Sequence, residues 1–343
     1  MTEQRRILAV CDASAGNRRQ AEALAAAVAK QANGAAETLV IAPTAPWRWL
    51  SPYRLPLSAW AFDVAFRQQL RKPPDIAIGC GRQAALATRL LRSAGSRVVQ
   101  ILDPRIAPSN YDLVIVPEHD GLSGDNVITT LGSLNPVDDD WLAEMRQRFA
   151  RFAALPSPRI LLALGGPTKT WPLDELSFER IADAVSALHA RLGGSLLVTT
   201  SPRSPDWLRD AVQSRLCGLT SELWLGDAAA AANPYPGFLA HADLIIATPD
   251  SANLLSEAAA TGAPLLCPPW PEQTGKLSAL VAALHARKNL TWLPDAKVIV
   301  SDGVDLAEQS ASRSTLHQHV AELAAEVSRR LQFSNRMLRK KGN

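Results

Sequence analysis

The chain has 343 residues, of which 47% are apolar and 20% are charged, and its formal net charge is +3. This composition is that of an ordinary globular protein, and the charge is too small to indicate a nucleic-acid partner. A chain of this length exceeds the size at which a single hydrophobic core stops growing, so we expect two domains.

The beginning of the chain and the cysteines indicate the compartment. An apolar run starts at Ile7, which leaves no room for a signal peptide. No apolar run approaches the roughly 20 residues that span a bilayer. The four cysteines are scattered, without metal-binding spacing, and three of them end apolar runs, where reduced cysteines are usual. We therefore expect a cytoplasmic protein that at most lies on the inner face of a membrane.

Short apolar runs alternate with longer segments of helical periodicity along the chain. The first half has runs at residues 7–11, 38–41, 75–79, 97–102 and 112–116. The second half has runs at residues 159–164, 195–200, 243–247 and 264–267. Because these runs are apolar throughout, they indicate parallel strands covered by helices on both faces. The pattern predicts an α/β fold with two doubly wound, Rossmann-like sheets.

The domain boundary is expected in the segment "ARFAALPSPRI". Its Pro156-Ser157-Pro158 has the composition of a linker, and a new apolar run follows at once. We therefore predict one domain over residues 1–155 and a second over residues 156–343. The last helix, expected over residues 315–331, has an apolar stripe that should pack on a domain surface. The stripe consists of Leu316, Val320, Leu323, Val327 and Leu331.

Ligands of open α/β sheets bind beyond the carboxyl ends of the strands, and the first such end carries the loop "CDASAGNRRQ". Its polar residues are Asp12, Ser14, Gly16 and Asn17. They suit backbone contact with a ligand, although a plain helix cap uses the same residue types. The loop lacks the GxGxxG spacing of a dinucleotide site, so we expect no cofactor.

Two strand ends in the second half also carry polar groups. In "LALGGPTKTWPLDEL", Gly165 and Gly166 allow close backbone approach, and Thr168 and Lys169 offer donors and a positive charge. This is not the spacing of a Walker A loop, and a glycine-rich turn with an exposed lysine is the alternative. In "VTTSPRSP", hydrogen-bonding side chains exceed what a turn needs, although Ser-Pro pairs are common turn signals. These side chains are Thr199, Thr200, Ser201 and Arg203.

The segment "DLIIATPDSANLLSEAAATGAPLLCPPW" places a polar pair after a strand and a carboxylate in the next helix. Ser251 lies at the start of that helix, where free N–H groups favour a phosphate. Glu257 follows six residues later, about 9 Å along the axis. This spacing suits a diphosphate at the helix tip and a ribose beside the next turn. Alternatively, Asp250 is a plain cap and Glu257 faces solvent.

Several segments together resemble the bacterial ELM1-like family, named for a plant mitochondrial-fission factor. They are "GRQAALATRLLR", "VVQILDPRIAPSNYDLVIVPEHD", "NVITTLGSLN", "GGPTK", "TTSPRSP" and "TPDSANLLSEAAATGAP". The last segment is also similar to the donor-site helix of GT-B glycosyltransferases. The resemblance implies two Rossmann-like domains facing a cleft, with a nucleotide-sugar donor on the C-terminal domain.

Carried over onto this chain, the GT-B pattern makes Ser251 the diphosphate contact and Glu257 the ribose contact. Fixed positive groups would stabilise the leaving diphosphate without a metal ion. We expect the carboxylate of Glu257 to face the ligand and to contribute little to the core. The expected nucleotide-binding residues are Gly165, Gly166, Thr168, Lys169, Thr200, Ser201, Arg203, Asp250, Ser251 and Glu257.

The resemblance makes the N-terminal domain the acceptor side, where inverting transfer needs a general base. The candidates for catalytic residues are Asp12, Asp103, His119 and Asp120, and the resemblance favours the segments that hold the last three. Asp103 can instead pair with Arg105 in a turn, and His119 can be a satisfied buried histidine.

The favoured function is transfer of a sugar from a UDP-linked donor to an envelope glycan or glycolipid. A nucleotide-sugar epimerase of the GT-B type and a non-catalytic partner-binding protein remain as alternatives.

The segment "APWRWLSPYRLPLSAWAF", residues 45–62, combines aromatic residues with Arg48 and Arg54. Such a combination suits the headgroup zone of a membrane, and it suits a protein interface or core packing as well. The aromatic residues are Trp47, Trp49, Tyr53, Trp60 and Phe62.

Overall fold

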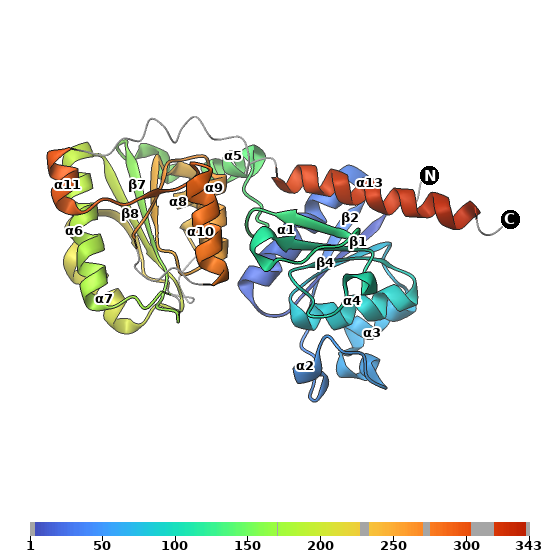
Figure 1. The fold of residues 1–343 in the computed structure, drawn as a ribbon. Coiled ribbons are helices and arrows are strands. Elements are labelled where there is room, and N and C mark those ends of the chain that lie inside the picture. The colour runs from blue at the N-terminus through green and yellow to red at the C-terminus, as the bar shows by residue number, and fades with distance from the viewer. Residues whose placement is uncertain (1–3, 170, 227–232, 270–274, 303–318, 341–343) are drawn as a thin grey trace. The chain divides into compact units, whose positions relative to one another are not determined.

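The computed structural model describes residues 4–169, 171–226, 233–269, 275–302 and 319–340. The chain forms two compact units, each built on a six-stranded parallel sheet (Figure 1). Unit 1 comprises Met1–Pro136 together with Gln318–Asn343, and unit 2 comprises Val137–His317. The predicted α/β class with two Rossmann-like units is confirmed.

The sheet of unit 1 has the strand order β2-β1-β3-β4-β5-β6. Its strands are β1 (Arg6–Cys11), β2 (Ala35–Val40), β3 (Ile76–Cys80), β4 (Arg97–Ile101), β5 (Leu113–Pro117) and β6 (Val127–Thr130). Its α-helices are α1 (Ala15–Ala32), α2 (Trp47–Leu50), α3 (Val64–Arg71), α4 (Arg82–Ala94) and α13 (His319–Lys340). Three short 3-10 helices are η1 (Ser58–Ala61), η2 (Pro108–Asn110) and η3 (Glu118–Asp120).

Strand β1 shows why an uninterrupted apolar run forms a central strand. Successive side chains of a strand point to opposite faces of the sheet. Ile7, Ala9 and Cys11 pack under α1 and α13, whereas Leu8 and Val10 pack under α3 and α4. Both faces are therefore covered, as the sequence predicts.

The sheet of unit 2 has the order β12-β11-β10-β7-β8-β9. Its strands are β7 (Arg159–Leu164), β8 (Ser195–Thr200), β9 (Thr220–Trp224), β10 (Leu244–Ala247), β11 (Leu265–Cys267) and β12 (Thr291–Trp292). Its α-helices are α5 (Asp139–Arg148), α6 (Glu175–Leu192), α7 (Asp206–Leu216), α8 (Tyr235–His241), α9 (Ala252–Ala260), α10 (Lys276–Ala286) and α11 (Ala296–Ser301). The 3-10 helix η4 spans Ala150–Ala154.

All nine predicted strands are present, and β6, β9 and β12 were not predicted. These three strands lie at sheet edges and are only partly buried. An edge strand lacks a neighbour on one side, so its sequence does not need the continuous apolar run of a central strand.

The boundary between the units differs from the expected one at residues 155 and 156. Residues 137–155 belong to unit 2, because α5 and η4 pack against α8. Phe152 is fully buried with its ring 5.0 Å from that of Phe238, and Arg146 Nε donates a hydrogen bond to the Ala240 carbonyl (2.8 Å). The proline-rich segment therefore connects two elements of one unit.

The last helix packs on a domain surface as predicted, but on unit 1 rather than on the C-terminal unit. Leu323, Val327 and Leu331 of α13 join the core cluster that contains Leu24 and Val28 of α1 (Figure 1). Leu316 of the predicted stripe lies outside the described residues. No helix among the described residues is long and apolar enough to cross a membrane.

Candidate functional site

The candidate site lies where the strand order of unit 2 reverses, between β7 and β10. The loops after these two strands diverge to opposite faces of the sheet, which leaves the crevice in which α/β sheets bind ligands. Gly165 and Gly166 follow β7, and Asp250 and Ser251 follow β10. The structure thus brings two of the predicted polar segments together.

Thr248 joins the two loops through its hydroxyl group. It accepts a hydrogen bond from the Gly165 N–H (2.8 Å) and donates one to Asp250 Oδ1 (2.7 Å). A Cβ atom on residue 165 would lie 1.8 Å from Asp250 Oδ2. Glycine is therefore required at position 165 as long as Asp250 keeps its place.

Asp250 is a buried carboxylate, with 8% of its surface exposed. Burial raises its pKa from 3.8 to about 6, and the hydrogen bond from Thr248 and the charge of Arg203 only partly oppose this rise. Ionisation of the Asp250 carboxyl group therefore destabilises the folded protein.

The loop after β8 lies against Gly166 on its other side. A Cβ atom on residue 166 would lie 3.0 Å from the Arg203 carbonyl oxygen. Ser201 shapes this loop, since its N–H donates to the Leu164 carbonyl (2.9 Å) and its Oγ accepts from the Arg203 N–H (3.2 Å). Thr200 is buried, and its hydroxyl oxygen has no hydrogen-bond partner among the described residues.

Two cationic side chains, Lys169 and Arg203, lie on these loops and are exposed. Neither side chain makes a hydrogen bond or an ion pair with any residue that the structure describes. Thr168 is used differently, because it forms a turn with Trp171 through two hydrogen bonds of 2.7 and 3.0 Å. The site therefore offers two cations and closely approached backbone, which suit a polyanionic ligand.

The start of α9 is capped by Ser251, whose Oγ accepts from the Leu254 N–H at 3.4 Å. Asp250 is not the cap, because its carboxylate accepts from Thr248. The alternative in which Asp250 simply caps the helix is therefore wrong.

Glu257 is buried rather than facing solvent, with 5% of its surface exposed. Its Oε2 accepts a hydrogen bond from the Tyr235 hydroxyl (2.9 Å), which joins α9 to the start of α8. The expectation that this carboxylate contributes little to the core is therefore wrong, because the buried group is part of the packing of unit 2.

Asp12, a candidate base, lies at the corresponding reversal of unit 1, between β1 and β3. Its carboxylate accepts from the Ser14 N–H (3.0 Å) and from Asn17 Nδ2 (3.1 Å). Asn17 in turn lies against Gly81 at the end of β3, where a Cβ atom would come within 2.5 Å of Nδ2. The polar loop is therefore fitted closely to the neighbouring strand end.

Asp103 accepts a hydrogen bond from the Arg105 N–H (2.8 Å) and pairs with the Arg105 guanidinium (3.4 Å). The alternative, in which Asp103 pairs with Arg105 in a turn, is therefore present in the structure. Asp12 and Asp103 follow β1 and β4, which β3 separates, so the sheet does not place them side by side. His119 and Asp120 are half-buried in η3, after β5.

The sequence did not point to the roles of Thr248 and Tyr235. Thr248 lies in the quoted motif, and its place at the end of a buried strand was the available signal. Tyr235 precedes Glu257 by 22 residues, so no local pattern links the two. Among the residues that the structure describes, no three His, Cys, Asp or Glu side chains gather into a metal-binding group.

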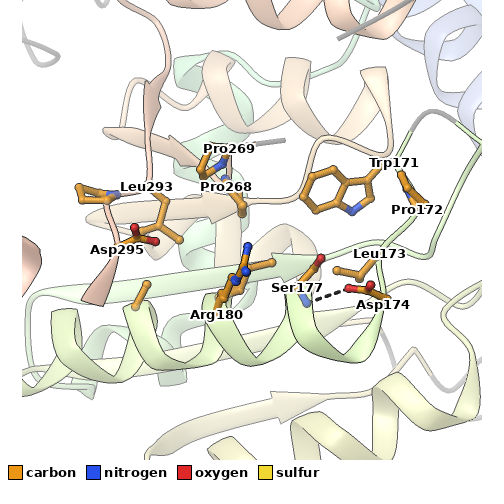
Figure 2. A pocket seen from close by; sticks show the side chains of 13 residues that line it. Trp171, Pro172, Leu173, Asp174, Ser177, Arg180, Pro268, Pro269, Leu293 and Asp295 are labelled. Atoms are coloured by element: carbon orange, nitrogen blue, oxygen red, sulfur yellow. Dashed lines mark hydrogen bonds between the residues drawn. The ribbon is translucent and has the colours of Figure 1, made fainter. Parts of the chain in front are cut away.

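A cavity of about 420 Å³ lies in unit 2, beyond the carboxyl ends of β11 and β12. Figure 2 shows Arg180 reaching from α6 toward Pro268, with Trp171 at one end and Leu293 at the other. None of the predicted nucleotide-binding residues lines it. The cavity and the predicted nucleotide-binding residues therefore occupy different parts of unit 2.

The family model described as Mitochondrial fission ELM1 matches residues 15–331. The mitochondrial fission protein ELM1 of Arabidopsis thaliana is 29% identical to this chain over 220 residues. This match covers 56% of the chain and 51% of the plant protein, so it spans about half the length of that relative.

Solved structures of GT-B glycosyltransferases and epimerases share the fold. The UDP-GlcNAc 2-epimerase of Neisseria meningitidis bound to UDP-GlcNAc has a TM-score of 0.61 and 13% identity, over 95% of this chain and 99% of that chain. A glycosyltransferase of Rickettsia africae ESF-5 has a TM-score of 0.54 and 12% identity, over 98% and 99% of the two chains. At this identity the likeness establishes the fold, which is of the GT-B type.

We predict that Gly165→Ala destabilises the protein by about 1–3 kcal/mol, because the added methyl group displaces the carboxylate of Asp250. The same change in an Asp250→Ala background should cost much less, because the opposing carboxylate is then absent. Urea denaturation of the four proteins of this cycle at pH 7.5 measures the coupling. Equal costs in both backgrounds would show that the two residues do not oppose each other.

Ionisation of Asp250 should make stability depend on pH. Its folded-state pKa is raised, so its contribution is fully present below pH 3.8 and is lost as the pH rises through about 6. A rise of this size corresponds to about 3 kcal/mol. Asp250→Asn should therefore gain stability relative to wild type between pH 4 and pH 7 by up to that amount, whereas the exposed Asp210→Asn should not. Parallel pH profiles for wild type and Asp250→Asn would contradict the assignment.

Proposed function

This chain belongs to the mitochondrial fission ELM1 family, and we propose that it is a metal-independent glycosyltransferase that uses a UDP-linked sugar. The observation that carries the proposal is the loop cluster at the β7–β10 reversal, which combines the Gly165-Gly166 turn and the start of α9. The loops after β7 and β8 add two cations, Lys169 and Arg203, whose side chains make no hydrogen bond or ion pair with the described residues. The Neisseria protein of the same fold was solved with UDP-GlcNAc bound, which supports a donor of this class.

In the proposed complex the diphosphate lies against the backbone of Gly165 and Gly166 and the first turn of α9. The N–H groups and the helix dipole at Ser251 favour negative charge there. Lys169 and Arg203 neutralise the charge that develops on the leaving diphosphate, since neither side chain makes a hydrogen bond or an ion pair with the described residues. Such fixed positive groups can supply the stabilisation that a metal ion supplies in other transferases.

The reaction we propose is displacement at C1 of the donor sugar. The acceptor hydroxyl oxygen forms a bond to C1 while the bond from C1 to the diphosphate oxygen breaks, and the diphosphate keeps the electron pair. The hydroxyl proton passes to a general base of unit 1. We place Asp12 first among the candidates, because it lies at the strand reversal where α/β sheets bind ligands, whereas Asp103 is paired with Arg105.

For the acceptor we propose an envelope glycan or glycolipid, reached by a cytoplasmic protein that contacts the inner face of the membrane. Large apolar side chains at the surface of unit 1 support this setting, since they include Trp49 and Trp60. Unit 1 would then hold the acceptor, and unit 2 the donor.

Epimerisation of the donor sugar is the second candidate reaction, and the shared fold with the Neisseria epimerase favours it. The two reactions differ in their products. Transfer releases UDP only when an acceptor is present, whereas epimerisation gives a second UDP-sugar without an acceptor.

A thermal-shift screen followed by product analysis tests the proposal. We expect UDP and a UDP-sugar to raise Tm by mass action, and UDP to be released from the sugar when a membrane glycolipid extract is added. A new UDP-sugar formed without the extract would replace transfer by epimerisation. No response to any nucleotide would refute both reactions and favour a partner-binding role.

Glu257→Gln should lower the affinity for UDP about ten- to a hundredfold, because a hydrogen bond to a charged group contributes about 1.5–3 kcal/mol. Since Glu257 is buried, the variant should also lose some stability, so a matched variant is needed. Tyr235→Phe removes the hydrogen bond to Glu257 Oε2 but keeps the carboxylate. Calorimetric titration with UDP should show a much larger loss for Glu257→Gln than for Tyr235→Phe. Equal losses would make Glu257 a structural residue.

A further inference from the structure

Unit 1 carries a concentration of exposed apolar side chains between residues 49 and 64. Their exposed fractions lie between 44% and 69%. They are Trp49, Leu50, Tyr53, Leu57, Trp60 and Val64. In the rest of the described chain, the large exposed apolar side chains are scattered: Val40, Leu176, Leu192, Leu219, Val298 and Val300. Gathered exposure of this kind marks an interaction surface.

The surface is presented by a loop with fixed internal structure, residues 44–61, which we call the aromatic loop. The Thr44 N–H donates to the Ala61 carbonyl (2.8 Å) and closes the loop at its base. Inside it, Ser58 exchanges two hydrogen bonds with the backbone of Leu55 (2.9 and 2.6 Å). In Figure 1 the aromatic loop, with α2, projects beyond α3 and α4. The exposed side chains are therefore held outward by an ordered backbone.

Not all aromatic residues of the segment belong to this surface. Phe62 is 3% exposed, and its ring lies 4.3 Å from that of Phe66 in the core. Trp47 is partly buried and packs against the same core cluster. Trp49, Tyr53 and Trp60 remain exposed. The segment thus anchors itself through two of its aromatic residues and presents the other three.

Helix α4 holds the aromatic loop through arginine side chains. Arg82 donates to the Trp49 carbonyl (3.2 Å), and Arg89 donates to the Pro52 carbonyl (2.8 Å). In addition, Arg54 of the aromatic loop donates a hydrogen bond to Ser93 Oγ of α4 (2.8 Å). These contacts place positive charge around the base of the exposed apolar side chains.

The charge of this region is mainly positive. Residues 42–74 contain the basic side chains Arg48, Arg54, Arg67, Arg71 and Lys72, and one acidic side chain, Asp63. Asp63 accepts from the Phe66 N–H as the cap of α3. Helix α4 adds three arginines and no acidic residue. A partner of this surface must therefore combine negative charge with an interior that accepts apolar side chains.

We propose that the aromatic loop docks on an anionic phospholipid bilayer, with Trp49, Leu57 and Trp60 among the lipid headgroups and the surrounding arginines on the lipid phosphates. Tryptophan and tyrosine favour this zone because their rings are apolar and their N–H or O–H groups stay hydrated. Each basic side chain near the surface adds attraction to anionic lipids. A second copy of the chain fits less well, because two surfaces of the same sign repel each other.

The inference rests on the proposed function, sugar transfer at a membrane surface, but it does not involve the donor site. Lipid binding is measured without nucleotide, and nucleotide binding is measured without lipid. Failure of one therefore does not imply failure of the other.

Vesicle flotation of the full chain tests the docking surface. Wild type should float with vesicles of phosphatidylglycerol and phosphatidylcholine at low salt, less at high salt, and not with phosphatidylcholine alone. The double variant Trp49→Ala, Trp60→Ala should bind the anionic vesicles with an affinity lowered by a factor of about ten or more, because two large apolar side chains are lost. Leu176→Ala with Val300→Ala, which removes equally exposed apolar side chains from unit 2, should bind as wild type.

The melting temperature without ligand serves as the folding control, since the aromatic-loop variant should keep the wild-type value. Wild type that stays unbound at low salt, or equal binding by both double variants, would overturn the proposal. Light scattering that shows a dimer in wild type and a monomer in the aromatic-loop variant, without flotation of either, would assign the surface to a second copy instead.

Discussion

The close approach of Asp250 to the backbone of Gly165 is the constraint around which unit 2 organises its ligand end. The carboxylate occupies the space that any side chain at position 165 would need. It also holds Thr248 in the orientation that accepts the first N–H of the glycine turn. The loops after β7 and β10 are therefore positioned by contact with each other, at the point where the sheet leaves room for a ligand.

Burial of the Asp250 carboxylate lowers the stability of the fold, which indicates a role other than packing. A buried carboxylate with a raised pKa destabilises the folded protein when it ionises, and aspartate is seldom used for packing alone. Nearby, the side chains of Lys169 and Arg203 make no hydrogen bond or ion pair with the part of the chain that the structure describes, although the charge of Arg203 acts on Asp250. Ionisable groups with shifted pKa values cluster at functional sites.

The two units share one arrangement at the point where the strand order reverses. In unit 1, a carboxylate after the first strand is again fitted to a glycine at the end of the neighbouring strand, here through Asn17 between Asp12 and Gly81. Unit 1 also inserts the aromatic loop between β2 and α3, where it is held by arginines of α4. The proposed donor site and the apolar surface therefore belong to different units, and each is built from its own unit's contacts.

The sequence by itself determined the central strands, the α/β class and the residues of the glycine and Asp-Ser turns. These follow from local patterns, because a strand covered on both faces must be apolar at every position and a close backbone approach needs glycine. The edge strands β6, β9 and β12 lack that pattern and were missed for the same reason.

Only the tertiary structure decided which side chains are buried and which segments meet. Glu257 is joined to Tyr235 of another helix, and α13 returns to unit 1 after the whole of unit 2. Within one aromatic segment, Phe62 enters the core while Trp60 stays exposed. Burial depends on packing against residues far away in the chain, and no local pattern of a single sequence contains that information.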